Sequence, residues 1–175
     1  MEPVSKTIDW FGRKVTLTWI ETHDPNELLK YFPVTQAYGI CFNSQGEILV
    51  LDQEGNNEWT LPGGTVEEGE TPRETLEREI SEEADVTVAD VHLLGVQRVE
   101  DPQNSDVHKH THYQARYFAL VDLVLPQTPD PAKNRIHERR FVPSSEVTQY
   151  IKWGVTGDAI FASATEHYNS RHSQL

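Results

Sequence analysis

The segment that most constrains the fold is Leu61–Val86, in which a glycine pair and a carboxylate-rich helix follow a short apolar run. A proline interrupts that run and the pair Gly63–Gly64 follows it, so the sequence predicts a loop whose backbone can approach a bound group closely. The helix then begins with a clear signal, because Thr71 can cap it, Pro72 suits its first position and Glu74 completes a capping box. The helix is therefore predicted to begin near Pro72.

This helix has two distinct faces at about 100° per residue. One face is apolar and suited to packing, and three glutamates at positions i, i+3 and i+4 gather on an adjacent face. Their repulsion costs a few tenths of a kcal/mol per close pair, so a positive partner is expected. A solvated acidic surface is one interpretation, but the glycine pair, the capped start and the spacing favour a site for a hard cation such as Mg²⁺ or Mn²⁺. The apolar residues are Leu76, Ile80 and Ala84, and the glutamates are Glu79, Glu82 and Glu83.

With these residues identified, the segment resembles the box that defines the Nudix hydrolase family, G-x5-E-x7-R-E-U-x-E-E-x-G-U, in which U is aliphatic. Asp85 is the one departure, because the family has a helix-ending glycine at that position. Asp tolerates the left-handed conformation better than most residues, so we expect a modest loss of stability and no loss of chemistry. The matching residues are Gly64, Glu70, Arg78, Glu79, Ile80, Glu82, Glu83 and Val86.

The resemblance implies an α/β fold, namely an α/β/α sandwich with a mixed central sheet and helices on both faces. Residues 36–175 would form the Nudix domain. Alternating apolar residues and turn signals predict strands at residues 36–43, 47–53, 88–99, 112–121 and 135–142. Helices are predicted to start at Ser144 or Ser145, stopped by Gly154, and to run from Asp158 to about Tyr168.

Residues 1–35 are predicted to form an N-terminal extension that packs on the main domain. Two short strands between Lys6 and Ile20 would flank a turn at Phe11–Arg13, and a brief helix would run from Asp24 to Tyr31. Packing is the role expected for the tryptophans of the extension, Trp10 and Trp19.

Composition limits the classes of function. A chain of 175 residues fits one domain. The formal net charge of −13 argues against extended nucleic-acid binding through a basic surface, and a small polyphosphate would need metal ions to neutralise the same repulsion. The single Cys41 excludes an internal disulfide framework. Because no signal peptide and no stretch of membrane-spanning length is seen, a cytoplasmic location without membrane contact is expected.

The resemblance implies hydrolysis of a phosphoanhydride bond in a nucleoside diphosphate linked to another moiety, with metal-activated water as the attacking group. Glu79, Glu82 and Glu83 would hold Mg²⁺, for which Mn²⁺ is a substitute. The backbone carbonyl of Gly63 would be a further ligand. The chemistry requires such ions because they neutralise the diphosphate and lower the pKa of a bound water.

Other residues of the site follow from the same resemblance. Arg78 would orient a catalytic glutamate or pair with Glu70, and Gly64 and Glu70 are candidate substrate contacts. The general base stays open between a box glutamate and a carboxylate outside the box. Glu138 is the candidate outside the box, and an exposed strand acid is the alternative interpretation of it.

The segment Val107–His112 places three histidines at alternate positions, hence on one face if it forms a strand. Such a face would suit zinc or another transition ion. The polar loop before it, Asp101–Asp106, favours solvated histidines or a contact to substrate phosphate. We therefore take His108 and His110 as candidate substrate contacts.

The candidate substrates are nucleoside triphosphates, including oxidised ones such as 8-oxo-dGTP, ADP-ribose and other nucleotide sugars, and dinucleoside polyphosphates. Pro102 is a slight indication of ADP-ribose, because relatives that cleave it tend to carry a proline near this place. Two classes of function stay open: an active Mg²⁺-dependent pyrophosphohydrolase, which the filled acidic positions favour, and a module that binds a nucleotide without cleaving it. A monomer and a homodimer are both open. Side chains able to stack on a base are Tyr38, Trp59, Tyr113 and Phe141.

Overall fold

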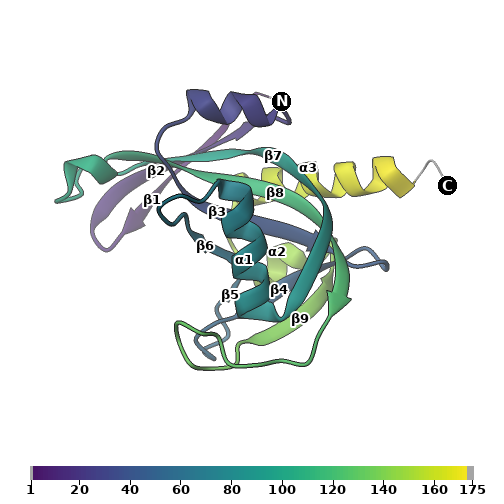
Figure 1. The fold of residues 1–175 in the computed structure, drawn as a ribbon. Helices are drawn as coiled ribbons and strands as arrows, with labels where there is room; N and C mark the ends of the chain where they lie inside the picture. Colours follow the sequence, from purple (N-terminus) through teal and green to yellow (C-terminus); the bar gives the residue numbers. More distant parts are fainter. Residues whose placement is uncertain (1, 173–175) are drawn as a thin grey trace.

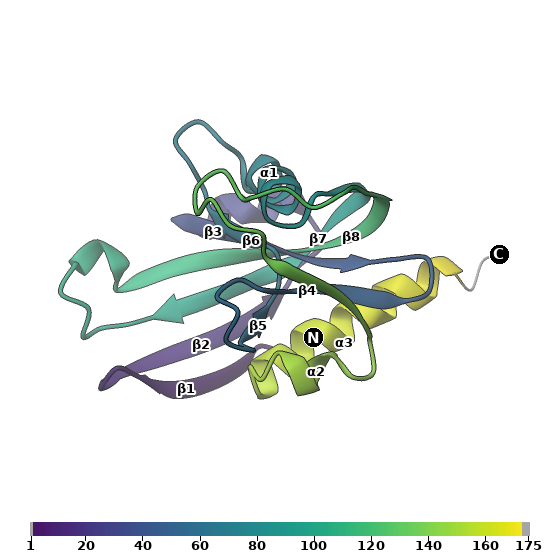
Figure 2. The same ribbon diagram turned by 90° about the horizontal axis from the view of Figure 1, so that it is seen from below.

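The strands of the protein join one mixed sheet in a computed structural model that describes residues 2–172. Helices cover both faces of this sheet, with α1 on one side and α2 and α3 on the other (Figure 1 and Figure 2). The strands are β1 (Val4–Trp10), β2 (Arg13–Glu21), β3 (Val34–Phe42), β4 (Glu47–Asp52), β5 (Trp59–Thr60), β6 (Gly63–Thr65), β7 (Val86–Glu100), β8 (Thr111–Val124) and β9 (Glu138–Pro143). The α-helices are α1 (Pro72–Ala84), α2 (Val147–Tyr150) and α3 (Val155–His172), and the 3-10 helices are η1 (Pro25–Lys30) and η2 (Val107–Lys109).

The strand order is β1-β2-β7-β8-β3-β4-β5, with β6 beside β3 and β9 beside β4. β3 runs parallel to β8, and the other paired strands are antiparallel, so the predicted mixed sheet is confirmed. The predicted hairpin of β3 and β4 is confirmed at its turn, where Phe42 pairs with Ile48. Beyond that pair the two strands diverge, because β3 continues beside β8 whereas β4 continues beside β9.

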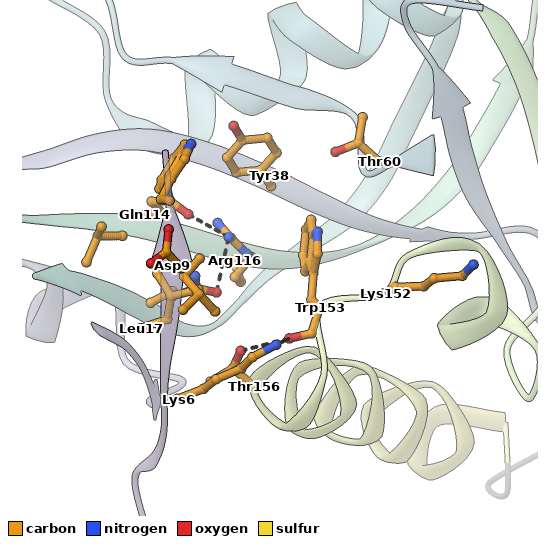
Figure 3. A pocket seen from close by; sticks show the side chains of 14 residues that line it. Lys6, Asp9, Leu17, Tyr38, Thr60, Gln114, Arg116, Lys152, Trp153 and Thr156 are labelled. Carbon is orange, nitrogen blue, oxygen red and sulfur yellow. Dashed lines mark hydrogen bonds between the residues drawn. The ribbon is translucent and has the colours of Figure 1, made fainter. Parts of the chain in front are cut away.

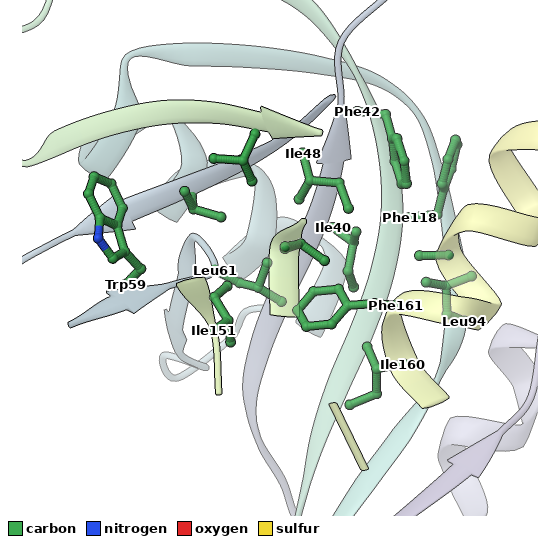
Figure 4. Close-up of a cluster of buried hydrophobic side chains, with 14 of the residues drawn as sticks. Ile40, Phe42, Ile48, Trp59, Leu61, Leu94, Phe118, Ile151, Ile160 and Phe161 are labelled. Carbon is green, nitrogen blue, oxygen red and sulfur yellow. The ribbon is translucent and has the colours of Figure 1, made fainter. Parts of the chain in front are cut away.

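Each face of the sheet has its own apolar core. On the α1 face, Leu76, Ile80 and Ala84 are fully buried against the sheet, as the helical pattern predicted. On the opposite face, α2 and α3 pack on side chains of β3, β4 and β8, among them Phe42 and Phe118 (Figure 4). Burying an aliphatic or aromatic side chain contributes roughly 1.5–3 kcal/mol, so the first core fixes α1 on the sheet and the second fixes α2 and α3. No helix within residues 2–172 combines the length and the apolarity that crossing a membrane requires.

The N-terminal hairpin and the short helix occur where the sequence predicted them. Phe11 and Gly12 form the turn with positive φ angles of 50° and 81°. β2 pairs with β7, so the sheet continues from the extension into the remainder of the chain, and the division at residue 35 stays a prediction. Trp19 is buried as expected, but Trp10 is 44% exposed because it lies at the end of the edge strand β1. The packing role predicted for Trp10 is therefore wrong.

The last third of the chain differs from the predicted boundaries. β9 begins at Glu138 rather than at Arg135, because residues 130–135 fold around the Asp130 carboxylate. α2 has four residues, and no serine caps it. α3 begins earlier than predicted, at Val155, since nothing interrupts the helix between Gly154 and Asp158, whose backbone groups are hydrogen-bonded.

Candidate active site

The helix α1 carries the predicted signals at both ends. Thr71 accepts a hydrogen bond from the Glu74 backbone N–H, and the Glu74 carboxylate accepts one from the Thr71 N–H, so the capping box is confirmed. Asp85 ends the helix in the left-handed conformation with φ 49° and ψ 47°. With its apolar side packed on the sheet, the helix presents its glutamates to a cleft.

This cleft of about 380 Å³ lies between α1, the glycine pair and the loop that joins β8 to β9. Acidic side chains outnumber basic ones along its walls, so the cleft is suited to a cation or to a ligand that brings cations. Its acidic residues are Glu67, Glu79, Glu82, Glu83 and Asp130, and its basic residues are Arg78 and Lys133.

Both positions of the glycine pair require glycine, because neighbouring atoms come too close for a side chain. Gly63 has φ 145°, and a Cβ atom there would lie 2.2 Å from the carbonyl oxygen of Ala37. Its backbone N–H donates to the Glu83 carboxylate at 3.1 Å. A Cβ atom on Gly64 would lie 2.4 Å from the Glu79 carboxylate. Gly63 thus packs closely on β3, and Gly64 leaves room for the Glu79 carboxylate.

Arg78 holds the acids of the cleft together. Its guanidinium donates to Glu70 at 2.7 Å, to Glu79 at 3.0 Å and to Glu82 at 3.2 Å, so the predicted pairing with Glu70 is confirmed. This hydrogen bond, with one from Thr75, lowers the pKa of Glu70 to about 2. Arg78 therefore compensates three carboxylates that would otherwise repel one another.

We expect Arg78→Met to lower the free energy of unfolding by about 2 kcal/mol. Removing one partner of a buried ion pair costs about 3–5 kcal/mol, and the loss is smaller here because the Arg78 side chain is 25% exposed. Arg73→Met is the matched control, since Arg73 pairs with Glu77 on the exposed side of the same helix and such pairs contribute about 0.5 kcal/mol. Urea unfolding measures both variants, and equal effects would contradict the role given to Arg78.

Glu83 is the most deeply buried acid of the α1 face, with an exposed fraction of 5%. Besides the Gly63 N–H, its carboxylate accepts a hydrogen bond from the Gln53 side chain. Burial and the nearby charge of Glu79 raise the pKa of Glu83 to about 7. Burial, with the charges of Glu82 and Asp130, also raises the pKa of Glu79, although Arg78 opposes the shift. Without a cation, the surroundings of Glu79 and Glu83 therefore disfavour the ionised forms of these two acids.

The loop between β8 and β9 supplies residues that the sequence did not single out. Glu83, Asp130 and His137 offer ligand atoms that all lie within 4.8 Å of one another, and all three side chains are buried. Burial alone would raise the pKa of Asp130, but hydrogen bonds from the Lys133 N–H and from His137 outweigh it, and the pKa is lowered. The available signal was the turn composition Pro129–Pro131 around Asp130, which says nothing about its neighbour in space.

His137 holds the loop in place through contacts to protein groups rather than offering a free nitrogen to a ligand. Its Nδ1 contacts the Gln53 carbonyl oxygen at 3.1 Å and its Nε2 contacts the Asp130 carboxylate at 3.1 Å. Both ring nitrogens are therefore engaged with protein groups, which leaves carboxylates as the ligands that the cluster can offer to an ion. Lys133 lies above Glu83, with its Nζ 3.8 Å from the carboxylate.

Three sequence candidates lie apart from the cleft walls. Glu138 is on β9 and pairs with Arg140 at 2.7 Å in an exposed position. Residues 107–109 form η2 rather than a strand, so the condition for placing the three histidines on one face is not met; Asp106 caps η2 by accepting the His108 N–H. His110 contacts the Asn104 carbonyl oxygen within the same loop. Neither His108 nor His110 lines the cleft.

A second cavity of about 410 Å³ adjoins the cleft, with Tyr38 and Thr60 lining both (Figure 3). Its wall contains Arg116, which is 2% exposed. The guanidinium carbon lies 4.6 Å from the centre of the Tyr38 ring and 5.4 Å from that of Trp153. The guanidinium donates to Gln114 at 2.7 Å. The Trp153 ring and the Arg116 guanidinium lie beside one another in Figure 3.

Arg116 is a buried cation without an acidic partner among residues 2–172. Burial lowers its pKa to about 10, so the side chain keeps its charge at neutral pH. A buried charge without a counter-charge costs several kcal/mol, which the two aromatic rings and the side-chain oxygens of Gln97 and Gln114 offset in part. The cavity is therefore suited to a ligand that brings hydrogen-bond acceptors or negative charge.

The sequence is similar to a protein family and to curated proteins. The model of the NUDIX domain family matches residues 32–162. An RNA pyrophosphohydrolase of Photobacterium profundum is 39% identical over 59 residues, which cover 34% of this chain and 33% of the relative. The chain thus spans about a third of the length of the curated relatives it matches.

Solved structures share the fold. A pyrophosphohydrolase of Bacillus subtilis has a TM-score of 0.57 at 20% identity, covering 78% of this chain and 76% of that chain. The NUDIX domain of Shewanella oneidensis NrtR, in complex with ADP ribose, has a TM-score of 0.58 at 17% identity, covering 84% of this chain and 99% of that domain. At these identities the likeness establishes the fold alone, which agrees with the predicted α/β/α sandwich.

Proposed function

The chain belongs to the Nudix family, and on this premise we propose that it hydrolyses a phosphoanhydride bond in a nucleoside diphosphate derivative, with Mg²⁺ bound in the carboxylate cleft. One observation carries the proposal: the box glutamates converge, and the innermost, Glu83, is buried beside Glu79 and Asp130. Burying like charges together is unfavourable unless a cation offsets them. A catalytic site explains why the chain has this arrangement.

The donor set fits a hard divalent cation. Glu79, Glu82, Glu83 and Asp130 offer carboxylate oxygens, and Gly63, whose carbonyl is the predicted further ligand, lines the same cleft. Mg²⁺ and Mn²⁺ prefer such ligands, whereas zinc favours nitrogen and sulfur. When bound, the cation would neutralise the diphosphate and lower the pKa of a coordinated water. The residues of this chain would supply its ligands and orient the phosphate chain.

Different side chains of the protein would position the carboxylates, bind a phosphate oxygen and accept a proton. Arg78 fixes Glu79 and Glu82 in place, and Lys133 at the rim offers a positive charge to a phosphate oxygen. A carboxylate must also accept the proton of the attacking water. Asp130 is better supported than Glu138 as the carboxylate outside the box, because Asp130 lines the cleft.

The second cavity is proposed to bind the nucleoside part of the substrate. It shares Tyr38 and Thr60 with the cleft, so one ligand can occupy both. Its aromatic and amide side chains suit a planar base, and Arg116 donates hydrogen bonds without an acid to compete for them. The names of the relatives add RNA to the candidate substrates, and the ADP ribose complex of the NrtR domain agrees with ADP-ribose, which is already a candidate.

We expect Arg116→Met to raise KM by about tenfold, the typical cost of losing one hydrogen bond from a charged group, with kcat changed less than KM. Replacing a buried charge by an apolar side chain of similar size is often neutral or stabilising, so the melting temperature should stay equal or rise. Steady-state kinetics with calorimetry tests this pair of effects. A large loss of stability with an unchanged KM would contradict a role in binding.

A panel of nucleotides assayed with Mg²⁺, alongside Glu82→Gln, tests the proposed function. The panel contains nucleoside triphosphates, 8-oxo-dGTP, ADP-ribose, a dinucleoside polyphosphate and an RNA with a 5′-triphosphate. We expect turnover of at least one member and a loss of about 100-fold in the variant, the typical cost of removing one charge-stabilising group. Absence of turnover on every member, or equal turnover by the variant, would favour a module that binds nucleotides without cleaving them.

A further inference from the structure

Asp85, the residue that departs from the family box, makes contacts that a glycine cannot make. Its carboxylate accepts hydrogen bonds from the Thr128 backbone N–H at 2.7 Å and from the Thr128 hydroxyl at 2.8 Å. Its backbone carbonyl accepts the Leu125 N–H at 2.9 Å. A glycine would keep only the last of these contacts and would adopt the left-handed conformation more readily.

The contacts join the end of α1 to the loop of residues 125–137. This loop has no helix or strand, and it passes the C-terminal end of α1 (Figure 1). Thr128 lies two residues before Asp130, whose carboxylate organises the rest of the loop by accepting the backbone N–H groups of Ala132 and Lys133. The attachment point at Asp85 is therefore next to the turn that places Asp130 in the cleft.

Polar contacts, rather than apolar packing, hold this loop against the body of the protein. Thr128 and Lys133 are exposed, so little apolar burial fixes their position. The other attachments are also polar: His137 contacts the Gln53 carbonyl, Lys133 contacts the Gln53 side chain and lies 3.8 Å from Glu83, and an exposed ion pair joins Arg135 to Glu54. Arg139 donates to the Leu125 carbonyl at the start of the loop and to the Ala84 carbonyl at the end of α1. Among these attachments, the hydrogen bonds to the Asp85 carboxylate join the end of α1 to the residue that lies two positions before Asp130.

We propose that Asp85 is a positioning residue, which fastens the loop of residues 125–137 to α1 and so holds Asp130 and Lys133 over the carboxylate cleft. The inference rests on the proposed function for its effect on catalysis. In this chain, an aspartate that fastens the loop stands where the family has a helix-ending glycine. Restoring the family residue should consequently weaken the enzyme.

Asp85→Gly tests the proposal in two independent ways. In the protein without substrate, hydrogen exchange of the backbone amides at residues 128–135 should become at least about tenfold faster, because two charge-assisted hydrogen bonds are lost. With substrate and Mg²⁺, kcat should fall by about tenfold while KM changes little, because the groups over the cleft are less well placed. Asp85→Asn should recover most of both effects, since an Asn oxygen can accept the Thr128 N–H and Asn adopts the left-handed conformation.

Asp90→Gly is the matched control, because Asp90 also has a positive φ angle, 53°, but contacts Arg171 and His92 far along the chain from the loop. It should leave loop exchange and kcat unchanged. Thr128→Val should weaken the attachment, and Thr128→Val added to Asp85→Gly should have little further effect.

Unchanged loop exchange in Asp85→Gly would overturn the attachment. Faster exchange with an unchanged kcat would overturn the positioning role. Hydrogen exchange is measured without substrate, so it tests the attachment even if the wild-type protein cleaves no nucleotide. Absence of cleavage by the wild type would refute the proposed function and not the attachment.

Discussion

Glu83→Gln is expected to lower kcat by about three orders of magnitude, which corresponds to about 4 kcal/mol of transition-state stabilisation. Glu83 is the deepest acid of the cleft, and its carboxylate is fixed by the Gly63 N–H and by Gln53. The amide keeps the size of the side chain but offers a weaker, uncharged ligand to a cation. The loss should therefore exceed the one expected for Glu82→Gln, whose side chain is more exposed.

Kinetics at saturating Mg²⁺ measures this effect. Glu77→Gln is the matched control, because Glu77 is on the exposed side of α1 and pairs with Arg73; its kcat should change less than about twofold. If Glu83→Gln kept wild-type turnover, the cleft would not be the catalytic site. If Glu77→Gln lost as much activity, the effect would come from the net charge of the helix rather than from the cleft.

The metal-free protein is expected to lose about 3 kcal/mol of stability between pH 4.5 and about pH 7 because of Glu83. The pKa of Glu83 is about 7 in the folded protein, above its ordinary value of 4.5. Between these values the folded protein holds a proton that the unfolded chain has released, so stability falls as pH rises through this window. Below pH 4.5 this contribution is fully present, and above about pH 7 it is lost.

Urea unfolding in EDTA across this pH range, with wild type and Glu83→Gln compared, isolates the contribution. In the variant, the free energy of unfolding should not show the fall with rising pH that Glu83 causes. The variant should also be the more stable protein at about pH 8, because a neutral amide is buried in place of a charge. Adding Mg²⁺ at about pH 8 should stabilise the wild type and not the variant. Parallel stability curves for the two proteins would contradict the burial of charge assigned to Glu83.

Local signals predicted α1 and its acids. The capping box, the apolar positions and the left-handed Asp85 are properties of adjacent residues, and each is confirmed. Arg78 and Glu70 pair as predicted because Glu70 directly precedes the N-cap Thr71 and Arg78 is in the second turn of the helix that follows. The catalytic and metal-binding roles of these residues stay predictions, which the experiments above test.

Residues that depend on contacts between distant segments were not predicted. Asp130 reaches Glu83 only because the loop between β8 and β9 folds back over α1, and Arg116 becomes part of a cavity only when α3 and its preceding segment close over the sheet. A local signal sets the conformation of the histidine segment, since Asp106 caps a short 3-10 helix at residues 107–109. The alternate spacing of the histidines would have placed them on one face only in a strand. Periodicity describes the faces of an element but not the neighbours that cover them.

An anomalous difference map of a crystal grown with Mn²⁺ and a non-hydrolysable nucleotide tests the central idea most directly. We expect a peak between the nucleotide phosphates and the carboxylates of Glu79, Glu82 and Glu83. A map with the nucleotide bound and no cation peak at these carboxylates would contradict the proposed metal-dependent hydrolysis.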